Sequence, residues 1–170
     1  MSRAFVRESD DRPELPVARP PSTLPAGARN YITRRGAARL EAELQRVRET
    51  ERPAFAASDD PDAKRKLAAV NQRVAQLEQS LQSAEVVDAT AGDLEVVRFG
   101  DTVTIRRANG DEDQYRIVGV DELDLERGWV SWLSPIARAL LNARRGERVR
   151  FRFPSGEEEL AIVKIEYEEA

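Results

Sequence analysis

The sequence contains neither cysteine nor histidine. Without cysteine there are no disulfides and no thiolate metal sites, and without histidine the usual general base near neutral pH and the commonest zinc ligand are missing. A Ser-His-Asp arrangement is excluded for the same reason. Any chemistry would have to come from Asp, Glu, Lys, Arg and Tyr, so we expect a protein that is not itself an enzyme.

Aromatic residues are also scarce. They make up 6% of the 170 residues, whereas charged residues make up 34%, a balance that predicts much exposed helix and a modest core. The formal net charge is -4, from 27 basic and 31 acidic residues, so no overall positive field draws the chain onto nucleic acid. No stretch is apolar enough for a signal peptide or a membrane span, and we expect a cytoplasmic protein that does not contact membranes.

Residues 1–30 form a proline-rich N-terminal segment. Five of the nine prolines lie here, at positions 13, 16, 20, 21 and 25, among scattered charges and few large apolar groups. Such a stretch cannot bury enough apolar surface to offset the entropy that ordering removes. We predict a flexible arm, which is either a docking tail or a solvated leader.

Residues 31–88 carry two apolar series with the spacing of paired helices. After Thr33, a good N-cap residue, the first series recurs at steps of three and four residues, broken only by Glu51. A second series has the same steps, which are typical of the seam of a coiled coil. The first consists of Ala37, Leu40, Leu44, Val47 and Ala54, and the second of Leu67, Val70, Val74, Leu77, Leu81 and Ala84.

The connection between the two series is short, residues 58–62 (SDDPD). A link of this length forces the helices to run antiparallel with their seams facing each other. Asp60 can cap the second helix, and Pro61 suits its first turn, where a missing N–H costs nothing. Pro53 lies inside the first helix and should kink it or unwind one turn. We predict a helical hairpin about 35 Å long, at 1.5 Å per residue.

Residues 92–170 have the pattern of a small β-rich domain. Residues 102–106 and 114–119 flank Asn109 and Gly110, a pair that favours a tight hairpin turn. Further strands are predicted at residues 129–132, 148–153 and 159–167, and a short helix at residues 136–143 behind Ser134 and Pro135. The expected aromatic core residues are Phe99, Tyr115, Trp129 and Trp132. The predicted fold class is α+β, an N-terminal antiparallel coiled-coil helical hairpin followed by an antiparallel β domain with one short helix.

The connection of the hairpin carries three candidate functional carboxylates, Asp59, Asp60 and Asp62. Carboxylates on a solvent-facing loop suit a hard cation such as Mg²⁺, which needs only one or two protein oxygens and keeps its waters. They could complete a metal site that a partner owns, or position a water there. Aspartate is equally a preferred turn and cap residue, and capping alone would explain Asp60. Capping explains Asp59 least.

Two further groups could contact a partner. Arg35, Arg39 and Arg46 lie close to one face of the first predicted helix, where they could meet phosphates or an acidic protein surface. Because glutamates are interspersed with them, an ordinary ion-paired, solvated face is the alternative. In the helix that follows Ser134 and Pro135, Arg138 should point outward from an otherwise apolar core helix.

With these residues in view, the chain resembles the GreA/GreB family of bacterial transcript cleavage factors. The resemblance begins at residues 31–33 (YIT) and runs through Gly36, Leu40 and residues 51–53 (ERP), which are nearer the GreB pattern. It continues at residues 84–88 (AEVVD), 99–105 (FGDTVTI) and 115–119 (YRIVG). The most specific segment is residues 134–141 (SPIARALL). In all, it covers residues 31 to about 167.

The resemblance implies a coiled-coil hairpin and a C-terminal domain with an FKBP-like fold. It implies bacterial RNA polymerase as the partner, with the C-terminal domain docked at the rim of the secondary channel, and we assign that docking to Ser134, Pro135 and Arg138. The hairpin would enter the channel, and Asp59 and Asp60 are the candidate ligands of a Mg²⁺ shared with the polymerase. Nascent RNA and DNA would be contacted only indirectly. We expect a monomer without a cofactor of its own.

Two departures from the family pattern change the expected activity. The family tip has a Gly-Asp-x-Ser-Glu-Asn-x-Glu-Tyr type of signature, whereas residues 58–62 read SDDPD. Each arm of the hairpin is also about one heptad shorter, which retracts the tip by roughly 10 Å. Because a magnesium ligand must lie about 2 Å from the ion, we predict a modulator of elongation rather than an ordinary cleavage factor. The alternatives are a regulator of the Rnk type and an FKBP-like binding or chaperone module without polymerase action.

Overall fold

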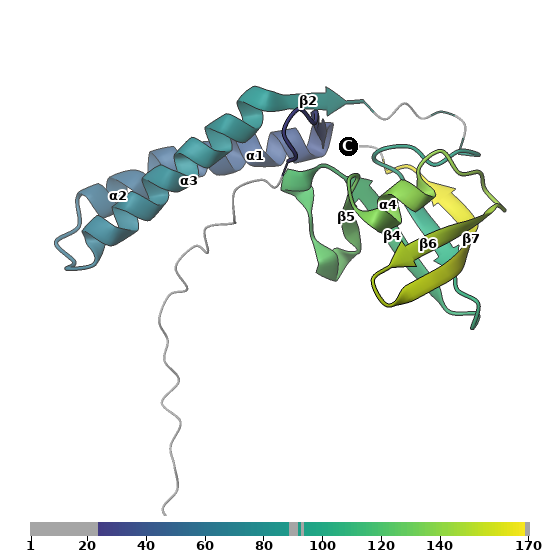
Figure 1. Cartoon of the computed structure of the whole chain (residues 1–170). Helices are drawn as coiled ribbons and strands as arrows, with labels where there is room; N and C mark the ends of the chain where they lie inside the picture. The colour runs from purple at the N-terminus through teal and green to yellow at the C-terminus, as the bar shows by residue number, and fades with distance from the viewer. Residues whose placement is uncertain (1–23, 89–91, 93, 169–170) are drawn as a thin grey trace, which may run out of the picture.

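The computed structural model describes residues 24–88, 92 and 94–168. Figure 1 shows a helical hairpin that extends away from a compact domain built around a curled β-sheet. The predicted fold class is thereby confirmed. Most of the predicted N-terminal arm lies outside the described residues. Within those residues no helix is both long and apolar enough to cross a membrane.

Two antiparallel arms form the hairpin. The first consists of α1 (Arg34–Arg46), a π-helical turn η1 (Val47–Glu51) and α2 (Arg52–Ala56), and the second is α3 (Ala63–Ser83). The Thr33 hydroxyl caps α1 as predicted, accepting the Gly36 N–H. Apolar side chains of both arms are buried along the seam, among them Leu40, Val47, Val70 and Leu77. At 21 residues, α3 is about 32 Å long.

A wide turn interrupts the first arm just before Pro53. Proline lacks the N–H of an α-helical bond and its ring collides with the carbonyl four residues earlier, so the chain opens into η1, where the Arg52 N–H bonds to the Val47 carbonyl. The predicted unwinding at Pro53 is confirmed. The prediction that Ala54 lies in the seam is wrong, because the wider turn takes up one extra residue. Ala54 is exposed, and Phe55 is the half-buried residue.

Polar contacts across the hairpin hold the two arms in register. Arg73 of α3 donates to Glu43 of α1 at 2.8 and 2.6 Å, and Arg48 pairs with Glu78. At the base, β1 (Asn30–Thr33) and β2 (Ala84–Val87) form a parallel two-stranded sheet that the sequence did not predict. This small sheet closes the end of the hairpin nearest the C-terminal domain (Figure 1).

The C-terminal domain contains a five-stranded sheet in the order β5-β4-β3-β7-β6. Its strands are β3 (Thr102–Arg106), β4 (Glu112–Val118), β5 (Trp129–Ser131), β6 (Arg148–Phe153) and β7 (Gly156–Glu166). All pairs are antiparallel except β4 with β5, so the sheet is mixed rather than purely antiparallel as predicted. The 3₁₀ turns η2 (Val120–Glu122) and η3 (Leu125–Arg127) carry the chain back, so that β5 runs in the direction of β4.

One short helix, α4 (Pro135–Leu140), covers the core of the described part of this domain. Ser134 caps it by accepting the Ala137 N–H at 3.2 Å, and Pro135 occupies the first turn, as predicted. The helix stops three residues earlier than predicted, because Leu141 is extended and Asn142 adopts a left-handed conformation at φ 66°. The helix and the sheet bury, among others, Val103, Ile105, Ile117, Leu140, Leu160 and Ile162.

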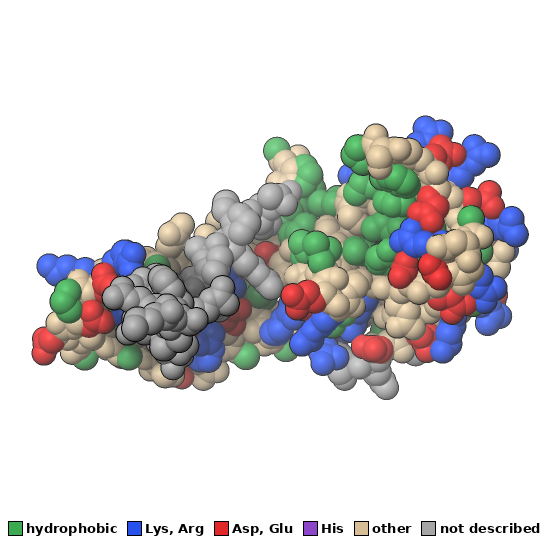
Figure 2. All heavy atoms as spheres, turned by 90° about the horizontal axis from the view of Figure 1, so that it is seen from below, with side chains coloured by type: hydrophobic (Ala, Val, Ile, Leu, Met, Phe, Trp, Pro, Cys, Tyr) green, Lys and Arg blue, Asp and Glu red, His purple; other side chains and the backbone are tan. Residues whose placement is uncertain are grey.

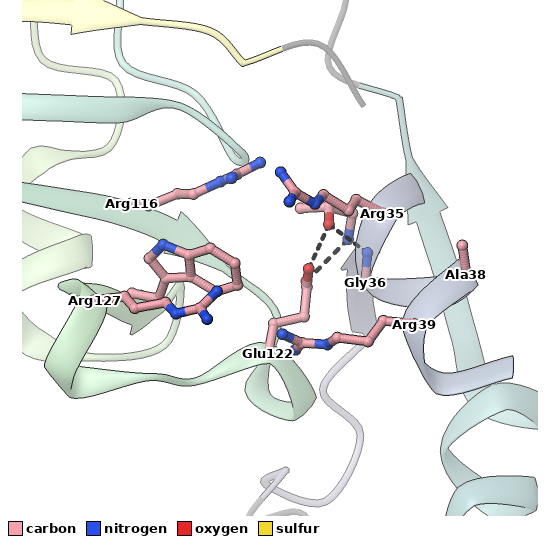
Figure 3. Close-up of a pocket in the computed structure, with 9 residues that line it drawn as sticks. Arg35, Gly36, Ala38, Arg39, Arg116, Glu122 and Arg127 are labelled. Carbon is pink, nitrogen blue, oxygen red and sulfur yellow. Dashed lines mark hydrogen bonds between the residues drawn. The ribbon is translucent and has the colours of Figure 1, made fainter. Parts of the chain in front are cut away.

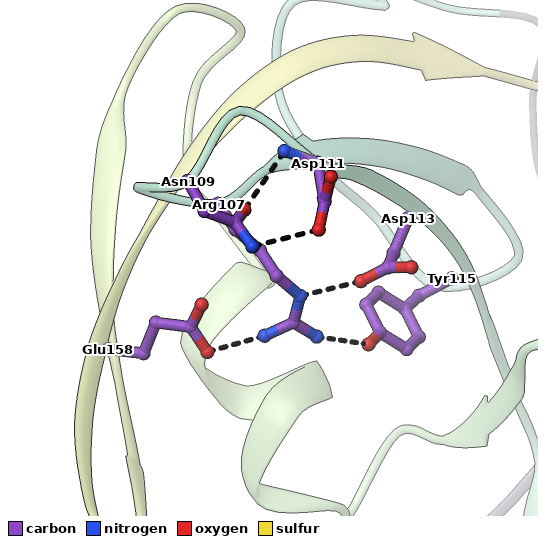
Figure 4. A network of polar contacts seen from close by, with 6 residues as sticks. All are labelled: Arg107, Asn109, Asp111, Asp113, Tyr115 and Glu158. Carbon is purple, nitrogen blue, oxygen red and sulfur yellow. Dashed lines mark hydrogen bonds and ion pairs between the residues drawn. The ribbon is translucent and has the colours of Figure 1, made fainter.

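A charged network fixes the turn between β3 and β4 (Figure 4). The Arg107 guanidinium donates to Asp113 at 2.6 Å, to the Tyr115 hydroxyl at 3.1 Å and to Glu158 of β7. The hydrogen bonds to the two carboxylates raise the pKa of Arg107 above its ordinary value. The Asn109 side chain accepts the Asp111 N–H at 3.0 Å, as the predicted tight turn requires. This end of the sheet is therefore rigidly tied together.

The hairpin joins the C-terminal domain through β1 and η2. The Tyr31 ring lies 5.0 Å from the Trp132 ring and 6.1 Å from the Phe99 ring, measured between centroids. Beside it the buried Glu122 carboxylate accepts the Thr33 N–H and the Gly119 N–H, at 3.0 and 2.9 Å. This joint sets the direction in which the hairpin leaves the domain.

Candidate functional site

The first candidate site is the connection between α2 and α3, at the end of the hairpin farthest from the C-terminal domain (Figure 1). Asp59, Asp60 and Asp62 are all exposed there. Figure 2 shows acidic and basic side chains together at this end of the molecule. The tip is therefore a mixed-charge surface held at a distance from the domain by the two arms.

Asp60 is the most engaged of the three tip carboxylates. One oxygen accepts the Asp62 N–H at 2.9 Å and the other pairs with Lys66 at 2.8 Å. The hydrogen bond from Lys66, followed by that from Asp62, holds the pKa of Asp60 below its ordinary value. The α-helix begins at Ala63, slightly later than predicted, so Asp60 stabilises the turn that leads into α3 rather than capping the helix itself. Its side chain has a structural role in the connection.

Asp59 and Asp62 are freer. The Asp62 carboxylate lies 3.6 Å from Arg65, a loose and exposed ion pair. No hydrogen bond or ion pair engages the Asp59 carboxylate among the described residues. Within the same residues no group of three or more Asp, Glu, His or Cys side chains could hold a metal. The tip can thus supply at most part of a metal's ligands, and Asp59 has the available oxygens.

The second candidate site is α4 and the residue that caps it. Ser134 is occupied with its cap, and Pro135 is exposed at the start of the helix. Arg138 is exposed on the outer side, whereas Ile136, Ala137 and Leu140 are buried beneath it. The helix therefore presents a proline and a cation on a rigid base, a surface suited to protein contact.

The structure separates the three arginines that the sequence placed on one face. Arg46 pairs with Glu51 of its own arm. Arg35 and Arg39 instead face the C-terminal domain across a pocket (Figure 3). The Arg39 guanidinium lies 5.6 Å from the centroid of the Trp129 ring. The alternative of an ion-paired face holds for Arg46, and the other two belong to the junction between the domains.

The opposite wall of this pocket was not predicted. It is formed by Arg116 of β4, Arg127 of η3 and Trp129 of β5. The prediction that Trp129 packs in the core is therefore wrong, because its ring lines this pocket. The other three aromatic residues do pack against the core. Nothing in the local pattern of residues 114–132 marks these side chains as neighbours of Arg35 and Arg39. Only the way η2 and η3 return the chain brings them together.

Comparison with known proteins identifies relatives over most of the chain. A family model described as "Transcription elongation factor, GreA/GreB, C-term" matches residues 92–167. Transcription elongation factor GreB of Neisseria meningitidis is 35% identical, over 82% of this chain and 94% of the relative. Transcription elongation factor GreA of Anaeromyxobacter is 38% identical over 81% and 92%, and GreB of Pseudomonas aeruginosa 38% over 88% and 95%.

Solved structures give matches of similar extent but low score. The GreA factor homolog 1 (Gfh1) of Thermus thermophilus is 26% identical with a TM-score of 0.39, covering 82% of this chain and 99% of that one. The GreA/GreB factor of Nitrosomonas europaea is 25% identical with a TM-score of 0.41, covering 82% and 99%.

The curated relatives are longer than this chain within the matched region. The match to the Neisseria protein runs over 154 residues but occupies 82% of this 170-residue chain, about 139 residues. About 15 positions of that match therefore have no counterpart here. The match to the Anaeromyxobacter protein, over 153 residues and 81% of this chain, gives the same difference.

Proposed function

This chain belongs to the GreA/GreB family of transcription elongation factors, and from that membership we propose that it binds bacterial RNA polymerase and regulates elongation without being an enzyme itself. The observation that carries the proposal is the match to curated elongation factors over about four fifths of the chain. The protein acts in the cytoplasm, where its partner is. It meets nascent RNA and DNA only within the elongation complex.

The two-part architecture supports a division of labour. The C-terminal domain docks at the rim of the secondary channel through α4, with Pro135 and Arg138 at the surface and Ser134 holding the helix start. The hairpin enters the channel and carries its aspartates inward. A rod stabilised along its length by buried residues and by the Arg73–Glu43 pair is suited to this task, because it reaches a site that the bulky domain cannot.

The action proposed at the tip is modulation rather than stimulation of RNA cleavage. About 15 positions missing relative to the curated relatives correspond to about two heptads, which supports a hairpin shortened by one heptad in each arm. A retreat of roughly 10 Å removes a tip carboxylate from the first shell of a magnesium ion. The engagement of Asp60 with Lys66 supports the same conclusion.

Asp59 is the residue through which any magnesium contact would be made. Its carboxylate has no partner among the described residues, and the tip provides too few ligands to hold the ion without the polymerase. The ion would supply Lewis acid chemistry that belongs to the polymerase site. The curated relatives named above are all elongation factors, so neither an Rnk-type regulator nor a chaperone module is proposed.

Binding to RNA polymerase is the experiment that tests this function. The purified full-length chain should bind the core enzyme in a pull-down or by interferometry, and Arg138→Glu should weaken binding at least tenfold by reversing an exposed docking charge. Arg152→Glu on β6 reverses an exposed charge on the same domain and serves as the control. Absence of binding by the wild-type chain would remove the proposal. Equal loss in both variants would remove the assignment of docking to α4.

A further inference from the structure

The pocket between the hairpin and the C-terminal domain is a feature that the proposed function does not use. It has a volume of about 370 Å³ and lies between the first turns of α1 and the edge of the sheet formed by β4 and β5. Pockets that hold small molecules usually enclose 300–1,000 Å³. The space is therefore large enough for a compact organic ligand.

Four arginines from the two domains converge on this pocket. In Figure 3, Arg35 and Arg116 extend into it from opposite sides, and Arg39 and Arg127 also border it. The guanidinium carbons of Arg39, Arg116 and Arg127 are 5.6, 5.1 and 5.4 Å from the centroid of that ring. Four like charges brought together at one place repel each other unless an anion lies among them.

The carboxylates nearby neutralise these arginines only in part. No carboxylate pairs with Arg35 or Arg39 in the described part of the chain. Arg127 has an exposed partner in Asp124 at 3.4 Å. The buried Glu122 contributes one negative charge, but its oxygens already accept N–H and O–H groups of the junction.

Arg116 is the second, independent sign of a ligand. Its side chain is only 7% exposed, and its Nε has no hydrogen-bond partner. Its ion pair is with Glu168, whose own side chain is 60% exposed. A buried guanidinium with an unused donor is costly unless something accepts from it. Arg116 also lines the pocket, so its buried charge lies beside the space that a bound anion would occupy.

We propose that this pocket binds the phosphate groups of a small anionic ligand of nucleotide size. Guanidinium groups present paired donors that match phosphate oxygens, and several converging arginines suit a group with more than one charge. The Trp129 ring adds an apolar wall for the remainder of the ligand. Because Arg35 and Arg39 come from α1 and the other two arginines from the C-terminal domain, the bound ligand would also fasten the hairpin to the domain.

Calorimetric titration of the full-length chain tests this proposal without polymerase, so its outcome is independent of the proposed function. Pyrophosphate and a nucleoside diphosphate, titrated at low ionic strength, should each bind with one site and a Kd below about 1 mM. Added salt should weaken binding, because the contacts are ionic. Arg35→Gln and Arg39→Gln, both exposed and remote from the core, should each weaken binding about tenfold. Arg152→Gln, on the distant strand β6, is the matched control and should bind as the wild type does.

Several results would overturn the proposal. The first is the absence of saturable binding, and the second is unchanged affinity in both α1 variants. A third is tighter binding of a single-stranded RNA without terminal phosphates, or of a glutamate-rich peptide, through the same arginines, since either would make the pocket part of a macromolecular interface. In a parallel melting experiment, pyrophosphate should raise the unfolding temperature of the wild type more than that of Arg35→Gln, and an equal rise in both would count against the proposal.

Discussion

Glu122 and Thr33 join the two parts of the molecule through both oxygens of one carboxylate. The Thr33 N–H and hydroxyl both donate to Glu122, and the same hydroxyl accepts the N–H of Gly36 in the first turn of α1. The cap of the hairpin's first helix is therefore completed by a residue of the C-terminal domain. A change at this point should affect helix α1 and the junction together.

Gly36→Ala should destabilise the protein. Glycine in a helix is normally less stable than alanine, by about 0.5–1 kcal/mol. Here a Cβ at position 36 would lie 2.1 Å from Oε1 of Glu122, so we expect a loss of about 1–3 kcal/mol from overpacking. Urea denaturation of the two proteins measures the difference in the free energy of unfolding.

A double-variant cycle provides the control for this prediction. In the Glu122→Ala background the clash is gone, and Gly36→Ala should become neutral or stabilising. A loss of the same size in both backgrounds would show that the contact with Glu122 is not the cause.

The sequence predicted those parts of the fold that depend on neighbouring residues. The caps at Thr33 and Ser134, the tight turn at Asn109 and the seam at Leu40 and Leu77 each follow from local spacing, and the structure has them. After Val47 the buried positions of the first arm move by one residue. A repeating pattern could not predict this move, because it comes from the π-helical turn, which takes up one residue more than an α-helical turn. Ala54 was expected in the seam for that reason.

Phe55→Ala should destabilise the hairpin, because Phe55 takes the place in the seam that a regular helix would give to Ala54. Phe55 is half-buried, so we expect a loss of about 1–3 kcal/mol, below the 3–5 kcal/mol of a fully buried phenylalanine. Ala54→Ser is the matched control and should change stability by less than about 0.5 kcal/mol. Thermal or urea unfolding measures both, and a larger effect at Ala54 would argue against the π-helical turn.

Asp101→Asn should make the protein more stable at pH 7. Burial raises the pKa of Asp101 above its ordinary value, despite the Arg98 N–H that its carboxylate accepts at 2.8 Å. Because its pKa is raised on folding, the protonated form of Asp101 is the one that favours the folded protein. This contribution to the free energy of unfolding is complete below the pKa of the unfolded state and is lost as the pH rises through the pKa of the folded state. The asparagine variant keeps an acceptor for Arg98 but carries no charge to bury.

The pH dependence of this effect distinguishes charge from packing. The advantage of Asp101→Asn should be present at pH 7 and shrink as the pH falls through the raised pKa of the folded-state carboxyl. It should be gone below about 4, the ordinary pKa, where the unfolded chain is also protonated. Urea denaturation at both pH values provides the measurement. Glu126→Gln, which removes an exposed carboxylate, is the control and should have little effect at either pH. A difference that is the same at pH 7 and pH 4 would contradict the explanation from burial of charge.

The candidate sites were predictable to different degrees. The exposed tip and the surface of α4 follow from short motifs, so Asp59 and Arg138 could be singled out before the fold was known. The pocket combines Arg35 and Arg39 with Arg116, which lies far along the chain, and depends on a parallel strand pair that the sequence did not indicate. Long-range contacts of this kind have no local pattern.

The effect of this factor on backtracked elongation complexes tests the central claim most directly. RNA cleavage would be measured with the wild-type chain and with a variant in which Asp59, Asp60 and Asp62 are alanine, beside a complex without factor. We predict that the wild-type chain binds and alters the rate of elongation, while RNA cleavage stays at the level of the polymerase alone. Rapid cleavage that disappears in the alanine variant would contradict this account and show that the hairpin brings its carboxylates to the catalytic magnesium.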